Sequence, residues 1–168
     1  MAQTFEEVAG SELDALYQGA LFLAGGRTSR AEQLLVEAMT LAFREHLPES
    51  APEESRRWLE ARLARAFLRH FDDRPSQLPL ATVESIPLEA NAPDGLGSEV
   101  LYSAAAHLPP GSRVAIWLVL LRRWSYDEAA GVIDVDPSTM AGLLGHRDAL
   151  LQALFSGRGS TQARAGVQ

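Results

Sequence analysis

Residues 125–155, SYDEAAGVIDVDPSTMAGLLGHRDALLQALF, predict two short helices joined by a tight turn. Ser125 and Glu128 have the spacing of a capping box, in which each side chain bonds the other's backbone N–H, so the first helix should begin directly after Ser125. Asp136 can cap the second helix by accepting an orphan backbone N–H, and Pro137 is preorganised for the first helical position. The chain should therefore turn just before Asp136.

The predicted turn has the residue types that a helix-turn-helix requires. The first helix needs a small residue where the second crosses it, the turn needs a residue that tolerates left-handed dihedrals, and apolar residues must wedge the pair. Ala130 fills the first place and Asp134 the second, because Asp adopts left-handed dihedrals more easily than most residues. The apolar wedge would consist of Ile133, Val135, Met140 and Leu143. An ordinary helical hairpin that reads no DNA is the alternative interpretation of the same pattern.

The composition is that of a soluble globular protein. The chain has 168 residues, of which 46% are hydrophobic, enough to bury the core of one domain or of two small ones. Its apolar runs are too short to span a bilayer, and the stretch MAQTFEEVAG at its start lacks the pattern of a signal peptide. We therefore expect a cytoplasmic protein without membrane insertion.

No constellation of residues points to catalysis. The chain has no cysteine, which excludes disulfides, thiolate metal sites and thiol nucleophiles. Its four histidines are scattered without a second ligand at metal-binding spacing, and there is neither a nucleophile–base pair nor a Gly-rich phosphate loop. We expect no enzyme activity, no catalytic residues, no metal and no cofactor.

The net charge of −7 is unusual for a protein that binds nucleic acid, because Lys and Arg normally supply much of the affinity by neutralising phosphates. The distribution of the cations matters more than their sum. Every cation is Arg, since the sequence contains no Lys, and Arg suits planar and bidentate contacts.

Three helices are predicted in the first part of the chain, over about 4–23, 29–46 and 50–71. Each starts near a Ser or Thr that is followed three positions later by Glu, and a Gly-Gly pair stops the first. At 100 degrees per residue, one stripe of the third helix should be buried. That stripe consists of Leu59, Leu63, Ala66 and His70, flanked by Phe67.

A second stripe of the third helix is the best nucleic-acid surface in the sequence. It consists of Trp58, Arg62, Arg65 and Arg69. The Arg side chains can hold phosphates and the Trp can stack on an unpaired base. The alternative is a solvated charged face with Trp58 packed into the core.

The fold class that these patterns predict is all-α, with two small helical domains joined by a Pro-rich linker. The first domain covers 1–74 and the linker 75–97, where prolines recur and helical periodicity is lost. The second domain covers 98–157, with a short helix to about residue 107, a break at Leu-Pro-Pro, a longer helix and then the helix-turn-helix. Residues 158–168 should form a disordered tail.

The order of these parts resembles a sigma-70-family RNA polymerase sigma factor of the extracytoplasmic-function type. ALYQGALFLAGGRTSRAEQLLVEAMTLAFREH (15–46) is similar to region two, which binds core polymerase. WLEARLARAFLRHF (58–71) is similar to the helix that melts and reads the minus-ten element. LPPGSRVAIWLVLLRRWSYDEAAGVIDVDPSTMAGLL (108–144) is similar to region four, whose second helix reads the minus-thirty-five element.

The resemblance implies three groups of binding residues. The minus-ten strand would meet Trp58, Arg62, Arg65 and Arg69. The upstream duplex would meet Ser138, Thr139, His146 and Arg147. Core polymerase would meet Glu32, Gln33, Val36 and Glu37.

Region four is divergent. The family carries several basic residues on the recognition helix, whereas this chain has Ala141, Leu143, Gly145 and Asp148 there, with Arg147 as the only Arg. Attraction to phosphate should therefore be weak on this helix.

Two functions follow from the resemblance. The first is a sigma factor that binds core RNA polymerase and directs promoter recognition and transcription initiation. The alternative is a degenerate sigma mimic that binds an anti-sigma factor or another regulator without reading DNA. The expected partners are core RNA polymerase, promoter DNA and an anti-sigma factor.

Overall fold

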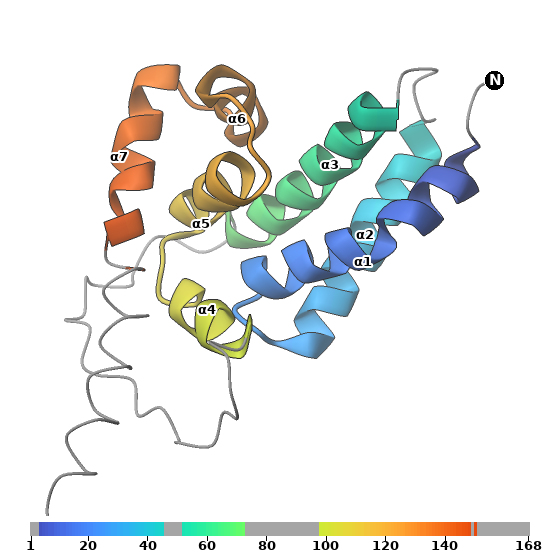
Figure 1. Ribbon diagram of the computed structural model, residues 1–168, viewed down its shortest axis with the longest axis horizontal. Coiled ribbons are helices and arrows are strands. Elements are labelled where there is room, and N and C mark those ends of the chain that lie inside the picture. The colour runs from blue at the N-terminus through green and yellow to red at the C-terminus, as the bar shows by residue number, and fades with distance from the viewer. Residues whose placement is uncertain (1–3, 46–51, 73–97, 149, 151–168) are drawn as a thin grey trace, which may run out of the picture.

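The computed structural model describes residues 4–45, 52–72, 98–148 and 150, and all regular structure within them is helical (Figure 1). The prediction of an all-α fold is confirmed. The predicted linker 75–97 and tail 158–168 lie outside the described residues. Among the described residues, no helix combines the length and apolar content that a bilayer span requires.

Three long helices form the first half of the described chain. They are α1 (Phe5–Leu23), α2 (Thr28–Glu45) and α3 (Pro52–Asp72), and each packs against the other two. The predicted capping box at the start of α1 is present, with Glu7 N–H donating to Thr4 Oγ1 at 3.3 Å and Thr4 N–H donating to Glu7 Oε2 at 3.0 Å. Gly25 and Gly26, with φ of 64° and 80°, turn the chain from α1 into α2.

The second half consists of shorter helices. They are α4 (Ser98–Ala105), α5 (Pro110–Ile116), a π-helical turn (Trp117–Leu121), α6 (Tyr126–Ile133), a 3₁₀ turn (Pro137–Thr139) and α7 (Met140–Gly145). The longer helix expected after Leu-Pro-Pro therefore changes to π-helical geometry from Trp117 onward. π-helix is rare in proteins and occurs mostly as single turns of this kind within or at the end of an α-helix.

The caps around α6 are those that the sequence predicts. Ser125 and Glu128 form the capping box, and the side chain of Asp136 accepts a hydrogen bond from Ser138 N at 2.9 Å. Asp134 ends α6 in the left-handed region, with φ of 63° and ψ of 48°. The tight turn between two short helices is thus confirmed, whereas its use in reading DNA stays a prediction.

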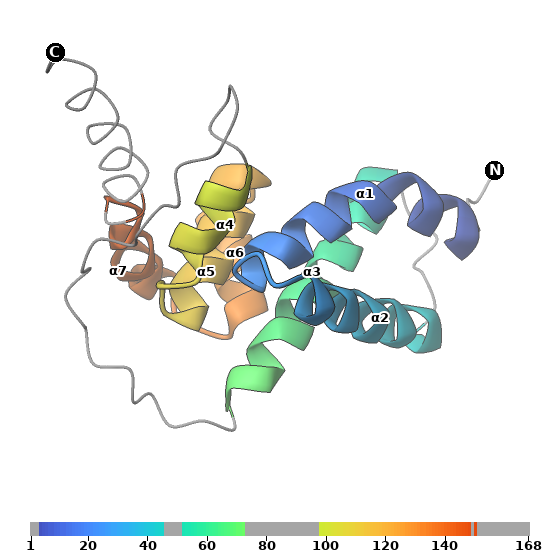
Figure 2. The same ribbon diagram turned by 90° about the horizontal axis from the view of Figure 1, so that it is seen from below.

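One hydrophobic core runs through both halves. Trp117 is buried against Gly19 of α1, and Figure 2 shows α4, α5 and α6 lying beside α1 and α3. Leu59, Leu63, Ala66 and Phe67 of α3 are buried in this core as predicted. The prediction for His70 is wrong: 36% of its side chain is exposed, because it lies in the last turn of α3 and bonds Glu37 of α2 instead of entering the core.

Candidate nucleic-acid and partner interface

The Arg stripe of α3 is only partly available to a ligand. Arg62 forms an ion pair with Glu45 of α2, and its guanidinium lies over the ring of Trp58 at 4.8 Å. Only 16% of the Arg62 side chain is exposed, and Trp58 is half-buried. Arg62 therefore serves mainly to cover Trp58 and to join α3 to α2.

Arg65 and Arg69 carry the charge that remains on this stripe. Arg65 is exposed and forms no ion pair with any residue that the structure describes. Arg69 is 60% exposed and lies 3.8 Å from Glu37. A phosphate could reach both side chains without displacing a buried contact.

The predicted polymerase face on α2 is exposed over most of its length. Glu32 and Gln33 are exposed, and Val36 is 67% exposed. Glu37 is in contact on its other side, because its carboxylate lies 2.5 Å from His70 Nε2 of α3. The structure therefore joins the predicted polymerase face to the end of the Arg stripe through Glu37.

An exposed aromatic side chain extends the same face of α2. Phe43, seven residues after Val36, is 66% exposed and packs edge-on against Phe5 of α1, with ring centroids 5.7 Å apart. The seven-residue spacing of Val36 and Phe43 could have been recognised in the sequence, since it places both residues on one side of a helix. Phe43 and Val36 thus both expose apolar surface on this side of α2.

The residues predicted to meet the upstream duplex lie at the two ends of α7, and most of them already form hydrogen bonds or ion pairs within the protein. Ser138 donates its hydroxyl to Asp136 at 2.5 Å, and Thr139 is exposed. The His146 ring is half-buried and bonds the Ser112 hydroxyl of α5 at 3.0 Å, while Arg147 pairs with its neighbour Asp148 at 3.3 Å.

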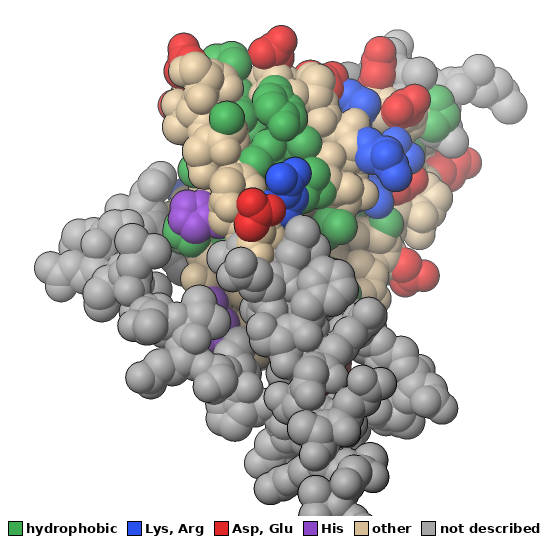
Figure 3. Space-filling model, turned by 60° about the vertical axis from the view of Figure 1, so that its left-hand side comes forward, with side chains coloured by type: hydrophobic (Ala, Val, Ile, Leu, Met, Phe, Trp, Pro, Cys, Tyr) green, Lys and Arg blue, Asp and Glu red, His purple; other side chains and the backbone are tan. Residues whose placement is uncertain are grey.

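The charge at the start of α7 opposes a phosphate. The Ser138 hydroxyl and, next, the Ser138 backbone N–H lower the pKa of Asp136, which therefore stays ionised where a phosphate would approach the helix. On the face shown in Figure 3, basic side chains lie beside acidic ones and form no continuous positive patch. In Figure 1, α5 and α6 lie between α3 and α7, so the two predicted DNA-binding sets do not meet.

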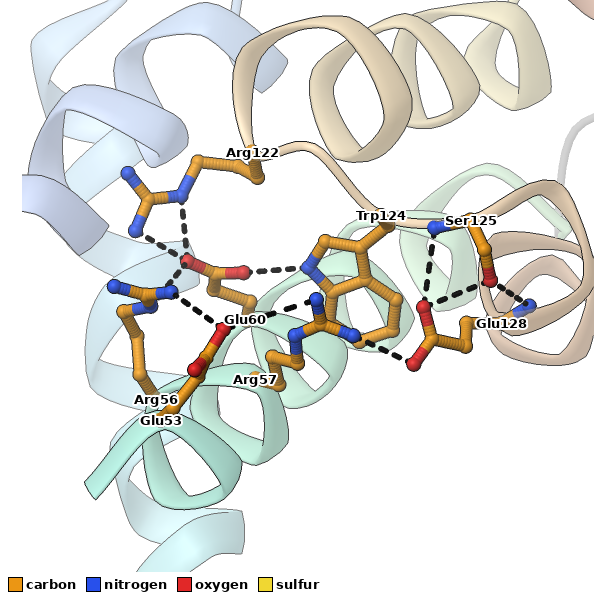
Figure 4. Close-up of polar contacts among 8 residues, drawn as sticks. All are labelled: Glu53, Arg56, Arg57, Glu60, Arg122, Trp124, Ser125 and Glu128. Atoms are coloured by element: carbon orange, nitrogen blue, oxygen red, sulfur yellow. Dashed lines mark hydrogen bonds and ion pairs between the residues drawn. The ribbon is translucent and has the colours of Figure 1, made fainter. Parts of the chain in front are cut away.

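A polar joint that the sequence analysis missed connects the two halves (Figure 4). At its centre is Glu60 of α3, which is only 1% exposed. One carboxylate oxygen accepts a hydrogen bond from Trp124 Nε1 at 2.7 Å, and the other accepts one from Arg122 Nε at 2.5 Å. Arg56 Nε lies 3.9 Å from the second oxygen. The carboxylate is thus shared between its own helix and the segment that precedes α6.

The backbone after the π-helical turn aims this segment at Glu60. Arg122 N–H bonds the Trp117 carbonyl at 3.0 Å, and Trp124 N–H bonds the Leu118 carbonyl at 3.0 Å. Between them Arg123 adopts a left-handed conformation with φ of 60°, which residues other than Gly, Asn and Asp rarely occupy. The reversal brings the side chains of Arg122 and Trp124 to the same carboxylate.

A second, outer pair closes the joint. Arg57 Nη1 donates to Glu128 Oε1 at 2.5 Å, and the Arg57 guanidinium lies over the Trp124 ring at 5.6 Å (Figure 4). Glu128 also completes the capping box of α6. Hydrogen bonds from Ser125 lower the pKa of Glu128 below its ordinary value of 4.5, with Arg57 making a smaller contribution.

Because its folded pKa is lowered, Glu128 contributes stability above its unfolded pKa and loses that contribution as the pH falls through the folded value. We therefore expect Glu128→Gln to lower the free energy of unfolding at pH 7 by about 0.5 to 1 kcal/mol, the size of a capping interaction. The difference from the wild type should shrink as the pH falls from 5 to 3 in urea titrations. Asp127→Asn, which removes an exposed charge from the same turn, should cost less at pH 7; a Glu128→Gln difference that stays constant to pH 3 would contradict the assignment.

Arg113 of α5 ties the halves together at a second point. Its guanidinium donates to the carbonyl of Leu23 at 2.5 Å and to the carbonyls of Ala106 and Leu108 at 3.0 Å each. It also lies over the ring of Phe67 at 5.3 Å. Burial, and secondarily Arg27, lowers the Arg113 pKa to about 10, so the side chain is still a cation at neutral pH.

Neither protein-family models nor curated protein sequences match this chain.

Proposed function

We propose that the chain is a sigma factor of the extracytoplasmic-function type, which binds core RNA polymerase and directs promoter recognition. The observation that carries the proposal is the Arg stripe of α3, where Arg65 and Arg69 remain exposed and the half-buried ring of Trp58 lies under Arg62 further along the same stripe. This stripe lies on the helix whose sequence resembles the minus-ten reader. Two exposed Arg side chains and an aromatic ring are suited to a single strand, since cations hold its backbone and rings stack on its bases.

The polymerase would bind the neighbouring face of α2. Glu32, Gln33 and Val36 are exposed there, and Phe43 adds apolar area to the same side. A mixed acidic and apolar helix face of this kind suits a partner helix with basic and apolar residues.

The turn between α6 and α7 would act as the helix-turn-helix of a second domain, with α7 at the upstream duplex. Ser138 and Thr139 can contact a phosphate at the start of this segment, but they carry no base-specific information. With Arg147 paired to Asp148 and Asp136 ionised nearby, affinity for duplex DNA must come mainly from the polymerase holding α7 in place.

The alternative function is a sigma mimic that binds an anti-sigma factor or another regulator. It is favoured by the engagement of the predicted DNA contacts within the protein: Arg62 pairs with Glu45 and His146 bonds Ser112. The exposed residues Val36 and Phe43 would serve such a protein partner equally well.

Transcription in vitro with core polymerase separates the two functions. We expect the wild-type protein to support promoter opening and the double variant Arg65→Ala/Arg69→Ala to reduce it at least tenfold. The plot of the logarithm of holoenzyme–DNA affinity against the logarithm of salt concentration should become less steep by about 1.4. Each contact with a single-stranded phosphate contributes about 0.7 to this slope, and the double variant removes two such contacts. Affinity for core polymerase should change little.

Arg30→Ala provides the control for each single change, Arg65→Ala and Arg69→Ala, because it removes one positive charge from α2 outside the stripe. Wild-type transcription and an unchanged salt slope in the double variant would refute the DNA role of α3. Binding to core polymerase without any promoter opening by the wild type would favour the mimic.

A further inference from the structure

A cavity of about 370 Å³ lies between the end of α1, the turn into α2 and the helix α4, which packs against α1 (Figures 1 and 2). Two helix faces form its walls. Tyr17 and Leu21 are one turn apart on α1, and Glu99, Tyr102 and Ser103 share one face of α4. The cavity is therefore built from residues outside the three predicted binding sets.

The glycines of the turn between α1 and α2 shape this cavity. Gly25 and Gly26 both line it. A Cβ on Gly25 would lie 2.5 Å from Cβ of Ala106, and one on Gly26 would lie 3.3 Å from Cβ of Tyr102. The two glycines thus allow α4 to approach the turn closely. The resulting volume is in the range of small-molecule sites, which is about 300 to 1,000 Å³.

The charge in the cavity is negative. Among the described residues that line it, Glu99 alone is charged. Its side chain is exposed and forms no ion pair or hydrogen bond with any residue that the structure describes. The neighbouring cation, Arg27, donates its Nε to the carbonyl of Ala24 at 3.2 Å and does not line the cavity. The carboxylate of Glu99 can therefore pair with a cation from solution.

Two tyrosine side chains line the same cavity. Tyr102 is only 8% exposed, and its hydroxyl donates to Oε1 of Gln18 on α1, which holds the ring in place. Tyr17 is half-buried. Aromatic rings attract ammonium ions, and several rings around one cation are a common way to recognise an organic amine. The exposed hydroxyls of Thr28 and Ser103 add acceptors for N–H groups.

We infer that this cavity binds a small organic molecule with a protonated primary amine. The ammonium group pairs with the carboxylate of Glu99 and donates to the hydroxyls of Thr28 and Ser103. The carbon atoms next to it lie against the rings of Tyr17 and Tyr102. This site goes beyond the proposed function and does not depend on it, because none of the residues assigned to polymerase or DNA takes part.

A titration with 3-methylbutylammonium tests the site, since this amine carries a short apolar stem that can pack on Leu21. In ¹H–¹⁵N spectra of the full chain we expect the amides of Gly26 and Ser103 to shift while those of α7 stay in place. A Kd of about 1 mM is within the ceiling for ligands of this size. The alcohol 3-methylbutan-1-ol, which lacks the charge, should bind about tenfold more weakly. Equal binding of the alcohol would overturn the inference.

Two substitutions test the residues that carry the site. Glu99→Gln should raise the Kd of the amine about fivefold, because it removes the paired charge. Glu6→Gln is the matched control, since Glu6 is also an exposed glutamate in the first turn of a helix but lies outside the cavity. Tyr17→Leu should raise the Kd about threefold, whereas Tyr17→Phe, which keeps the ring, should not. An unchanged Kd in Glu99→Gln, or an equal change in Glu6→Gln, would overturn the site.

Two further ligands test the chemical class. Tetramethylammonium has no N–H donor and should bind about threefold more weakly than the primary amine. Nα-acetyl-lysine amide represents a lysine within a peptide and should also bind more weakly, because its amide groups lose water on entering the cavity. Tighter binding of tetramethylammonium would overturn the assignment to a primary amine. Tighter binding of the lysine derivative would overturn the assignment to a small molecule.

Discussion

Glu60→Ala should lower the free energy of unfolding by about 3 kcal/mol, because removal of one partner from a buried ion pair leaves the other without compensation. Trp124 Nε1 would lose its acceptor, and Arg122, whose side chain is 25% exposed, would recover only part of its hydration. Urea unfolding followed by tryptophan fluorescence measures this loss. Since Trp124 belongs to the joint, its emission should also shift towards that of a solvated indole.

Two further variants of α3 make this prediction specific. Glu60→Gln keeps an acceptor for Trp124 but loses the ion pair with Arg122, so its cost should lie between zero and that of Glu60→Ala. Glu53→Ala removes a carboxylate whose side chain is 67% exposed and which pairs with Arg56 and Arg57. Its effect should stay below about 1 kcal/mol, the usual limit for surface ion pairs. Equal costs for Glu53→Ala and Glu60→Ala would show that the joint does not stabilise the fold.

Gly19→Ala should destabilise the protein by about 1 to 3 kcal/mol, as overpacking of a filled core does. A Cβ at this position would lie 2.5 Å from Cζ2 of Trp117 and 2.8 Å from its Cε2, distances at which the two helices have to move apart. Because Gly19 is in α1 and Trp117 follows α5, the displacement would loosen the contact between the halves. Thermal or urea unfolding would reveal the loss.

The control for this variant lies in the same helix. Gly10→Ala meets no atom within 4 Å, so it should stabilise the protein by about 0.5 to 1 kcal/mol through the lower backbone entropy of the unfolded chain. A cycle with Trp117→Phe isolates the steric contact, because the smaller ring makes room and the cost of Gly19→Ala should fall in that background. Stabilisation by both Gly→Ala changes would show that Gly19 and Trp117 are not in contact.

Local features of the fold could be predicted from the sequence because their causes lie within a few residues. The capping boxes at Thr4 and Ser125 involve residues three positions apart, and the left-handed turn at Asp134 follows from one residue type between two helices. The helical class and the buried stripe of α3 follow from periodicity, which reports which face of a helix is apolar. None of these predictions needs a partner from elsewhere in the chain.

The joint could not be predicted because its partners are distant in sequence. Glu60 contacts residues 62 and 64 positions further on, and nothing in their local sequence pairs them. One signal was present: Glu60 precedes Leu63, Ala64 and Phe67 at helical spacing, so an acidic residue interrupts an apolar face. The prediction for His70 was wrong for a related reason. Helical periodicity put His70 on the buried side of α3, but its contact with the carboxylate of Glu37 on α2 keeps it at the surface.

Contacts between helices that are distant in sequence also decide which of the predicted binding residues are free to bind a ligand. The sequence shows Arg62 as one of three similar cations on a stripe, but Glu45 reaches Arg62 while Arg65 stays exposed. Which Arg is available to a ligand therefore depends on where α2 ends relative to α3. Helix periodicity carries no information on that placement.

The distance in sequence between Glu60 and Trp124 also has a consequence for the newly made protein. At about 5 to 20 residues per second, synthesis of the 64 residues that follow Glu60, up to and including Trp124, takes roughly 3 to 13 s. Helices form in about a microsecond, so α1, α2 and α3 have time to assemble long before Trp124 exists. During those seconds the carboxylate of Glu60, the backbone of Gly19 and the carbonyl of Leu23 face solvent or a chaperone, and the nascent chain passes through a stage in which its future interior is accessible to other molecules.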